Sequence, residues 1–172
     1  MKSNARHARQ FAALPWRIGN GGLREVMLLT TRETHRWAIP KGWPMKGRKP
    51  AEVARQEAYE EAGLIGRMVG KRPVGSFHYE KRLAKKAIIC EVQVFLFRVE
   101  RQLDDWPEKG QRECRWFDAN EAATLVEEGG LAEILDRFAG SRVRLVPRLG
   151  GRSRYARQHG PAVLRANLDE ST

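Results

Sequence analysis

The sequence is that of a basic chain of ordinary domain size. It has 172 residues, of which 41% are hydrophobic, enough for one buried core with short extensions, so we expect one domain and not a multidomain machine. Lys and Arg number 32 against 21 Asp and Glu, a formal net charge of +11. This charge favours phosphate-rich partners over cationic ones, although a basic surface that is merely solvated would give the same composition.

Apolar stretches and cysteines bear on the cellular location of the protein. No run approaches the roughly 18 apolar residues of a membrane span. The basic start of the chain leads only into a short apolar run before Pro15, so we expect neither a membrane-spanning helix nor a secretory signal. Cys90 and Cys114 lie in separate strand-like settings, which predicts neither a disulfide framework nor a sulfur zinc site. A reducing cytoplasm is the simplest location.

Composition divides the chain into three parts. Residues 1–9 include basic side chains, no acid and no periodicity, which predicts a flexible arm. From residue 141 onward seven arginines stand against two acids. We expect this tail, 141–172, to be partly disordered, and either solvated or bound to nucleic acid. The folded domain is therefore expected over 10–140.

Short strands are predicted ahead of the first helix. Segments 11–16 and 26–30 are apolar and are separated by a glycine-rich segment, 19–22, a pattern typical of a β-hairpin. Residues 37–40 predict another brief strand. A loop rich in Gly, Pro and Lys is expected to follow over 41–49.

A helix is predicted over 50–62. Pro50 suits its first turn, because the missing N–H would be unpaired there, and Gly63 suits the position just past its end. Four alanines recur at spacings of three and four, which would let the helix pack closely against a sheet. They are Ala51, Ala54, Ala58 and Ala62.

A second hairpin is predicted in the middle of the chain. Segments 74–79 and 87–99 have the apolar character of strands. The segment between them, 80–86, is strongly basic, and we expect it to be a loop.

The last part of the domain mixes a strand with helices. A strand is predicted over 112–117, and a short helix near 119–127 that Asp118 or Asn120 could cap. A further helix is predicted over 130–139. Strands and helices mixed in this way predict an α/β fold in which helices enclose a mixed sheet.

Three carboxylates are predicted to share one face of the 50–62 helix. Glu57, Glu60 and Glu61 stand at i, i+3 and i+4, so they converge on one face. Like charges repel, and a hard divalent cation among them would relieve the repulsion. Oxygen ligands of this kind suit Mg²⁺ or Mn²⁺. An acidic solvated face would show the same spacing, so the triplet alone does not define a site.

The segment from Gly42 to Leu64 resembles the Nudix box. That box runs Gly, five residues, Glu, seven residues, Arg-Glu, an aliphatic residue, any residue, Glu-Glu, any residue, Gly and an aliphatic residue. The positions that match in register are Gly42, Glu57, Glu60, Glu61, Gly63 and Leu64, with Ala58 at the first aliphatic position. At background frequencies the five Gly and Glu matches have a chance of roughly 10⁻⁶ per start point, which argues against coincidence.

Two positions depart from the box. Arg48 stands in place of the first Glu, and Gln56 in place of the Arg before Glu57. In the family these two side chains normally pair and brace the loop, and changing both removes an ion pair without leaving one charge unpaired. We expect the bracing to be lost but not the metal ligands, with Arg48 free to approach Glu52 instead. A degenerate, inactive box is the alternative that remains open.

The resemblance extends over about residues 10–120. Segments 32–40, 74–77, 94–97 and 115–117 are similar to the branch that hydrolyses diphosphoinositol polyphosphates and diadenosine polyphosphates. This similarity implies an α/β/α sandwich with a mixed sheet. It also implies metal-assisted hydrolysis of a phosphoanhydride, in which water attacks phosphorus and a phosphate leaves.

The resemblance further implies roles for the site residues. Glu57 and Glu61 would be the main metal ligands, with Glu60 as a further ligand or the base. The carbonyl of Gly42 would complete the shell of a Mg²⁺ or Mn²⁺ ion. The general base often comes from outside the box in this family. The candidates for it are Glu80, Glu91 and Glu113.

Substrate phosphates would be held by basic side chains around the sheet edge. Arg holds phosphate through two hydrogen bonds, whereas Lys acts as a point charge. The candidates are Arg32, Arg36, Lys41, Lys81, Arg82, Lys85 and Lys86. For the last four, a solvated hairpin tip is an equal alternative. Aromatic residues near them favour a place in the core or at its rim over base stacking, so the sequence defines no nucleobase pocket.

These features predict a cytoplasmic, Mg²⁺-dependent Nudix pyrophosphohydrolase that acts on a highly phosphorylated small molecule. The substrate would be of the dinucleoside polyphosphate or inositol pyrophosphate class. The 5′-triphosphate end of RNA suits the basic charge equally, and an enzyme of broad specificity is a further alternative. The rival from another class is a non-catalytic module of this fold that binds RNA or another polyanion through the basic loops and tail.

Overall fold

Eight strands and three helices form the described part of the chain, residues 7–83 and 86–141 of a computed structural model. The strands are β1 (His7–Ile18), β2 (Arg24–Thr30), β3 (Trp37–Ala38), β4 (Lys41–Gly42), β5 (Leu64–Met68), β6 (Gly75–Leu83), β7 (Lys86–Gln102) and β8 (Cys114–Asp118). The helices are α1 (Pro50–Ala62), α2 (Ala119–Leu125) and α3 (Gly129–Gly140). The strands form one sheet with the main path β3-β2-β1-β7-β5, while β4 pairs with β1, β6 with β7 and β8 with β2.

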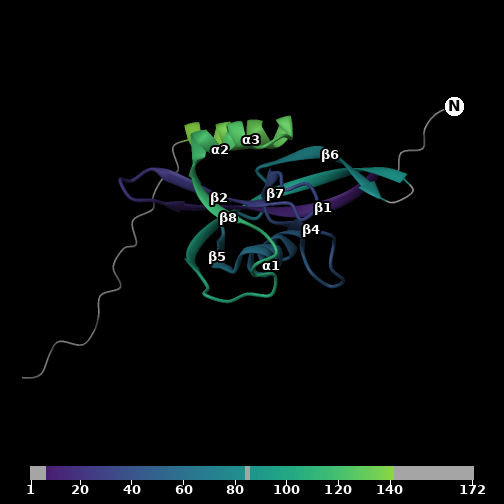
Figure 1. Cartoon of the computed structure of the whole chain (residues 1–172), viewed down its shortest axis with the longest axis horizontal. Helices are drawn as coiled ribbons and strands as arrows, with labels where there is room; N and C mark the ends of the chain where they lie inside the picture. The colour runs from purple at the N-terminus through teal and green to yellow at the C-terminus, as the bar shows by residue number, and fades with distance from the viewer. Residues whose placement is uncertain (1–6, 84–85, 142–172) are drawn as a thin grey trace, which may run out of the picture. The chain divides into compact units, whose positions relative to one another are not determined.

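Helices cover both faces of this sheet (Figure 1). Helix α1 lies on one side, and α2 and α3 lie together on the other. Strand β1 runs parallel to β7, from His7 opposite Ile89 to Trp16 opposite Arg98, and antiparallel to β2. The sheet is therefore mixed, and the expected α/β/α sandwich is confirmed.

The glycine-rich turn between β1 and β2 forms the predicted hairpin. The backbone N–H of Gly19 donates to the carbonyl of Leu23 at 2.8 Å, which closes the turn. Gly21 and Gly22 have φ angles of 89° and 79°, a left-handed conformation that glycine adopts readily and other residues adopt at a cost. The turn thus needs the glycines that the sequence places there.

Helix α1 begins and ends where the sequence predicts. At its start the carboxylate of Glu52 accepts a hydrogen bond from the backbone N–H of Lys49 at 2.8 Å, which satisfies a donor that has no partner within the helix. At its end Gly63 has a φ of 65°, and its N–H donates to the carbonyl of Tyr59 at 2.9 Å. This glycine cap stops the helix and turns the chain into β5.

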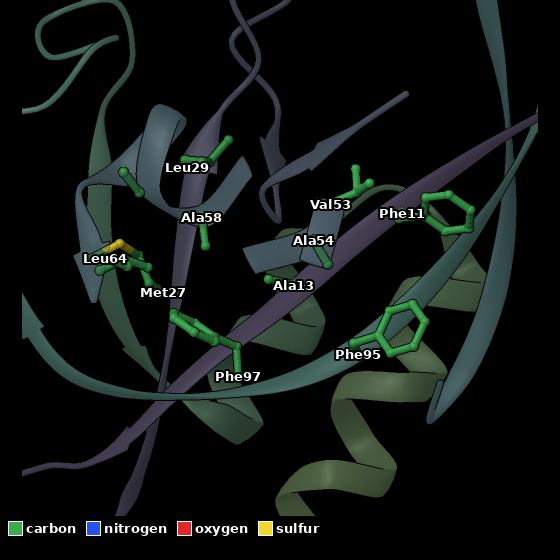
Figure 2. Packing of buried hydrophobic residues seen from close by; sticks show 11 residues of the cluster. Phe11, Ala13, Met27, Leu29, Val53, Ala54, Ala58, Leu64, Phe95 and Phe97 are labelled. Carbon is green, nitrogen blue, oxygen red and sulfur yellow. The ribbon is translucent and has the colours of Figure 1, made fainter. Parts of the chain in front are cut away.

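The predicted alanine stripe is the face through which α1 packs on the sheet. Ala54, Ala58 and Ala62 are fully buried, in a cluster with residues of β1, β2 and β7 (Figure 2). Small side chains let the helix approach the sheet closely, and an added methylene there would overpack the core at a cost of about 1–3 kcal/mol. This close packing also places the acidic face of α1 next to β4.

The second helical layer packs through larger side chains. The buried residues of α3 are Leu131, Ile134, Leu135 and Phe138, and the Phe138 ring lies 5.7 Å from that of Trp16 on β1. Asp118 caps α2 by accepting a hydrogen bond from the backbone N–H of Asn120 at 2.8 Å, as predicted. No helix in the described part of the chain is long and apolar enough to cross a membrane.

Three strand predictions need correction. Segment 80–86, expected to be a loop, is mostly strand, because β6 runs to Leu83 and β7 starts at Lys86. Side chains alternate between the two faces of a strand, so a run of basic residues is compatible with an exposed ribbon. Strand β4 forms inside the predicted 41–49 loop, where Gly42 pairs with Phe11. Strand β5 was not predicted at all.

The two ends of the chain lie largely outside the described residues. Strand β1 begins at His7, so residues 7–9, expected in the arm, pair with β7. The predictions for 1–6 and for 142–172, the remainder of the arm and nearly all of the tail, fall on residues that the structure does not describe.

Candidate active site

A groove with a volume of about 910 Å³ opens beside the second half of α1. The predicted site residues that line it are Gly42, Glu57, Glu61, Arg32, Arg36, Lys41, Lys81 and Arg82. Glu60 is not among its lining residues. Lys85 lies outside the described residues, and Lys86 is the first residue of β7. The fold therefore brings together two of the three box glutamates with five of the predicted phosphate-binding side chains.

Glu57 sits directly against the backbone of β4. A Cβ added to Gly42 would lie 1.9 Å from Oε1 of Glu57, so a larger residue at position 42 would displace this carboxylate from its present position. Burial raises the pKa of Glu57 to about 7, and the negative charges of Glu61 and Glu60 add to the effect. Glu57 is thus a half-buried carboxylate whose charge is poorly compensated.

Glu61 is buried, with 6% of its surface exposed. The guanidinium of Arg112 donates to Oε1 of Glu61 in a buried ion pair, and the backbone N–H of Lys41 donates to Oε2 at 3.1 Å. Burial raises the pKa of Glu61, whereas the charges of Arg112 and Lys41 oppose the increase. Both oxygens of this carboxylate are therefore fixed in place.

Glu60 is bonded to a neighbour on its own helix and does not line the groove. The amide of Gln56 donates to Oε1 of Glu60 at 2.6 Å, and Nη1 of Arg48 donates to the amide oxygen of Gln56 at 3.4 Å. The two residues that depart from the box are thus bonded to each other. The expected approach of Arg48 to Glu52 is wrong, because Glu52 caps the helix instead.

The cationic residues of the groove already have partners. Arg36 forms an ion pair of 2.9 Å with Glu127, and this hydrogen bond raises the pKa of Arg36. The ammonium of Lys41 lies 5.6 Å from the centre of the Tyr79 ring. Burial lowers the pKa of Lys41, and the charge of Glu61 opposes the decrease.

Two further basic residues of the groove, Lys81 on β6 and Arg32 in the segment 31–36, also have contacts. Nζ of Lys81 lies 5.1 Å from the ring centre of Trp43, which is 40% exposed. Arg32 donates to the side-chain oxygen of Gln111 at 3.2 Å. Cationic, aromatic and carboxylate side chains therefore all line the groove.

The structure separates the three candidates for a general base. Glu80 lines the groove. Glu91 pairs with Arg9 at 3.4 Å and Glu113 with Arg115 at 3.7 Å, and neither lines the groove. Of the three, only Glu80 is placed to exchange a proton with a molecule bound there.

Five charged lining residues were missed by the sequence analysis. Four are Glu108, Arg112, Glu127 and Glu128, and the fifth, Glu33, lies next to the predicted Arg32. Nothing in the local sequence of the first four distinguishes them from exposed loop residues, because each reaches the groove through contacts with distant elements. Arg112, for example, lies 51 positions from its partner Glu61.

The carboxylates of α1 fit a divalent cation, although no three acidic, His or Cys side chains in the described residues converge on a ready-made metal site. Glu60 is bonded to Gln56, and Glu61 to Arg112. The pair of Glu57 and Glu61 nevertheless offers oxygen donors only, next to a backbone surface that a Cβ would fill. Mg²⁺ commonly binds through one or two carboxylates and keeps several waters, so the kind and number of donors fit this ion.

Comparison with known proteins identifies the family. A family model described as the NUDIX domain matches residues 8–138. Curated relatives include Nudix hydrolase 12, mitochondrial, of Arabidopsis thaliana, which is 29% identical over 121 residues that cover 66% of this chain and 58% of that protein. Diphosphoinositol polyphosphate phosphohydrolase 2 of Rattus norvegicus is 27% identical over 106 residues, 60% of this chain and 55% of that protein.

Solved structures share the fold. The binary complex of the C. elegans Ap4A hydrolase superposes with a TM-score of 0.58 at 16% identity, over 77% of this chain and 95% of that one. The solution structure of the E. coli ORF135 protein gives a TM-score of 0.55 at 14% identity, over 78% and 89%. The chain belongs to the Nudix hydrolase family, which confirms the resemblance of the box. It spans 53–59% of the length of three Nudix hydrolases of Arabidopsis thaliana, numbers 12, 4 and 13.

Proposed function

We propose that this chain is a Mg²⁺-dependent hydrolase of a phosphoanhydride bond. The observation that supports this most directly is the position of Glu57, pressed against Gly42 and beside Glu61 at the wall of a groove that five predicted phosphate-binding cations also line. Family membership supports the same reaction class. The departures Arg48 and Gln56 leave both metal-facing carboxylates in place, so they do not argue for an inactive box.

Each group in the groove has a role in this proposal. Glu57 and Glu61 would hold Mg²⁺, which would supply positive charge to neutralise the phosphate oxygens and to activate the attacking water. Arg36 and Lys41 orient the phosphate chain by charge and hydrogen bonding. Glu80 is the candidate among the three outside the box to take the proton of the attacking water, and Glu108, which also lines the groove, is a further one.

The balance of charge in the groove bears on the substrate. Six cationic side chains line it within the described residues: Arg32, Arg36, Lys41, Lys81, Arg82 and Arg112. Seven carboxylates also line it: Glu33, Glu57, Glu61, Glu80, Glu108, Glu127 and Glu128. An inositol pyrophosphate has phosphates around its whole ring and needs cations on all sides. A dinucleoside polyphosphate concentrates its charge in a central chain between neutral nucleosides, which suits a groove of mixed charge better.

The aromatic side chains support the same preference. Trp43 lies at the groove and is 40% exposed, and Tyr79 also lines it. An exposed aromatic face such as that of Trp43 can stack on a nucleobase, and it offers little to an inositol ring. We therefore propose a dinucleoside polyphosphate as the preferred substrate. The inositol pyrophosphate class is the second candidate, supported by the similarity to the rat diphosphoinositol polyphosphate phosphohydrolase.

A substrate panel tests this preference. Phosphate and nucleotide release would be followed with Mg²⁺ on diadenosine polyphosphates, inositol pyrophosphates, nucleoside triphosphates and 5′-triphosphorylated RNA. The proposal predicts the highest kcat/KM on a diadenosine polyphosphate, and a Trp43→Ala variant that raises KM for this substrate but not for an inositol pyrophosphate. A higher kcat/KM on the inositol pyrophosphate would contradict the charge argument and favour the second candidate.

A further inference from the structure

Arg112 joins three parts of the fold at the wall of the groove. Only 8% of its side chain is exposed. Its guanidinium donates to Glu61 on α1, to Oε2 of Glu108 at 3.2 Å and to the backbone carbonyl of Thr30, at the end of β2, at 3.3 Å. A planar guanidinium with several donors in fixed directions can hold two carboxylates at a set separation, which a lysine cannot do.

Glu61 needs a counter-charge that its own helix does not supply. A buried carboxylate is costly unless a cation or several hydrogen bonds compensate it. On α1 the position next to Glu57 is Gln56, whose neutral amide is bonded to Glu60. Lys41 contributes a backbone N–H to Glu61 and a nearby ammonium. Arg112 is the cation whose guanidinium bonds directly to the Glu61 carboxylate.

Backbone hydrogen bonds join segment 103–113, which contains Arg112, to the end of α1. The backbone N–H of Leu103 donates to the carbonyl of Gly63 at 2.8 Å, and that of Glu108 to the carbonyl of Glu60 at 3.0 Å. The ring of Trp106 lies so close to Gly63 that an added Cβ would be 2.7 Å from it. Arg112 thus enters the groove from a segment whose position on α1 is set by several independent contacts.

We propose that Arg112 is a positioning residue, which holds Glu61 at the groove wall in the orientation that cation binding needs, with Glu108 bonded beside it. This inference rests on the proposed function, because it assigns Glu61 a cation to bind. The orientation of a metal ligand would then depend in part on segment 103–113, which lies outside the box helix. The charge that compensates Glu61 then comes from a residue that the box pattern does not contain.

The first test compares Arg112→Gln and Arg112→Lys with the wild-type protein and with Arg115→Gln. Arg115 lies three positions away, is exposed and pairs with Glu113, so its replacement makes the same change of charge away from the groove. We expect Arg112→Gln to weaken Mg²⁺ and Mn²⁺ binding by about tenfold or more, the usual size of effect for a group that orients a metal ligand. Calorimetry with the metal alone measures this without reference to turnover.

The kinetic readout separates positioning from substrate contact. With Arg112→Gln we expect the Mg²⁺ concentration for half-maximal rate to rise in parallel with the metal dissociation constant, while KM for substrate at saturating Mg²⁺ changes less than about threefold. Arg112→Lys should recover part of the metal affinity, and Arg115→Gln should match wild type. An increase in KM with unchanged metal affinity would overturn the proposal and assign Arg112 to substrate binding.

A double-mutant cycle tests the ion pair between Arg112 and Glu61 in the metal-free protein. Removing Arg112 alone leaves a buried carboxylate unpaired, so Arg112→Gln should lower Tm in EDTA, and Glu61→Gln in the same chain should restore most of the loss. Additive changes in Tm would overturn the claim that Arg112 acts through Glu61.

Wild-type protein that neither binds Mg²⁺ nor hydrolyses any substrate would refute the proposed function and, with it, the metal role of Arg112. Wild-type activity with metal binding unaltered in Arg112→Gln would refute only the inference about Arg112.

Discussion

The carboxylate of Glu57 occupies the space that a side chain at position 42 would need. An added Cβ on Gly42 would lie 1.9 Å from Oε1 and 2.2 Å from Cδ of Glu57, far inside van der Waals contact. Gly42 and Glu57, the first glycine and the first helical glutamate of the box, are 15 positions apart, and the position of the Glu57 carboxylate depends on the absence of a side chain at Gly42. The glycine is required by the carboxylate that it faces, and not by its own backbone conformation.

Gly42→Ala should accordingly weaken metal binding while the fold persists. The methyl group would push the Glu57 carboxylate out of its place, and we expect the Mg²⁺ dissociation constant to rise by about tenfold or more. Calorimetric titration with Mg²⁺ measures this. Gly129→Ala is the matched control, because nothing lies within 4 Å of a Cβ at that position. Equal metal affinity in the two variants would show that Glu57 does not need the space above Gly42.

The raised pKa of Glu57 predicts how the stability of the metal-free protein depends on pH. Its pKa in the folded protein is about 7, against an ordinary value of 4.5. The folded state therefore binds this proton more tightly than the unfolded state, and the carboxyl destabilises the fold increasingly as pH rises from 4.5 through 7. Glu57→Gln has no such charge, so in EDTA it should exceed wild type in Tm by a few °C at about pH 8.5 and by less at about pH 5.

Thermal unfolding at both pH values checks the Glu57 prediction. Glu133→Gln, an exposed position on α3, serves as the control and should change Tm equally at the two pH values. A Tm difference between Glu57→Gln and wild type that is the same at both pH values would contradict the account. It would mean that the Glu57 carboxyl is compensated by a group that the geometry does not show.

The hydrogen bond between Arg48 and Gln56 predicts a small contribution to stability. It spans 3.4 Å and is exposed, and exposed polar contacts are worth about 0–1 kcal/mol. Arg48→Ala should therefore lower the free energy of unfolding in urea by less than about 1 kcal/mol and leave the Mg²⁺ affinity unchanged. A large loss of metal affinity in Arg48→Ala would show that the altered box pair supports the carboxylates after all.

Gly63 is expected to be required both by its backbone and by its neighbour. Its φ is 65°, and a Cβ would lie 2.7 Å from the Trp106 ring. Gly110 has a φ of 81° with nothing within 4 Å of a Cβ. Gly110→Ala therefore measures the backbone cost alone, about 1 kcal/mol. Gly63→Ala should lose at least about 1 kcal/mol more in urea unfolding. Equal losses would show that Trp106 does not fix segment 103–113 on the helix.

The local part of the site could be predicted from the sequence. Pro50 and Gly63 mark the ends of α1 through effects of the nearest residues, and the spacing of Glu57 and Glu61 puts both on one face of the helix. The box pattern then linked this face to Gly42. The position of Glu60 was less predictable, because it is bonded to Gln56 and does not line the groove although it shares the helix face.

The rest of the site and of the fold depends on contacts between distant parts of the chain. Arg112 is one arginine among many, and only the packing of segment 103–113 on α1 brings it to Glu61. Strand β5 is short, and its pairing with β7 is interrupted by a register shift at Gly66, so no alternating pattern marks it. Lys81 and Arg82 were predicted in a loop, but pairing with β7 makes them strand residues.

The central claim is that Glu57 and Glu61 bind the cation on which hydrolysis depends. The most direct measurement is phosphate or nucleotide release from a diadenosine polyphosphate as a function of Mg²⁺, for wild type, Glu57→Gln, Glu61→Gln and the control Glu133→Gln. The account predicts turnover by wild type and the control that is abolished by EDTA, and losses of at least about 100-fold in kcat in both box variants. Turnover that persists in EDTA, or that survives the loss of either carboxylate, would contradict it.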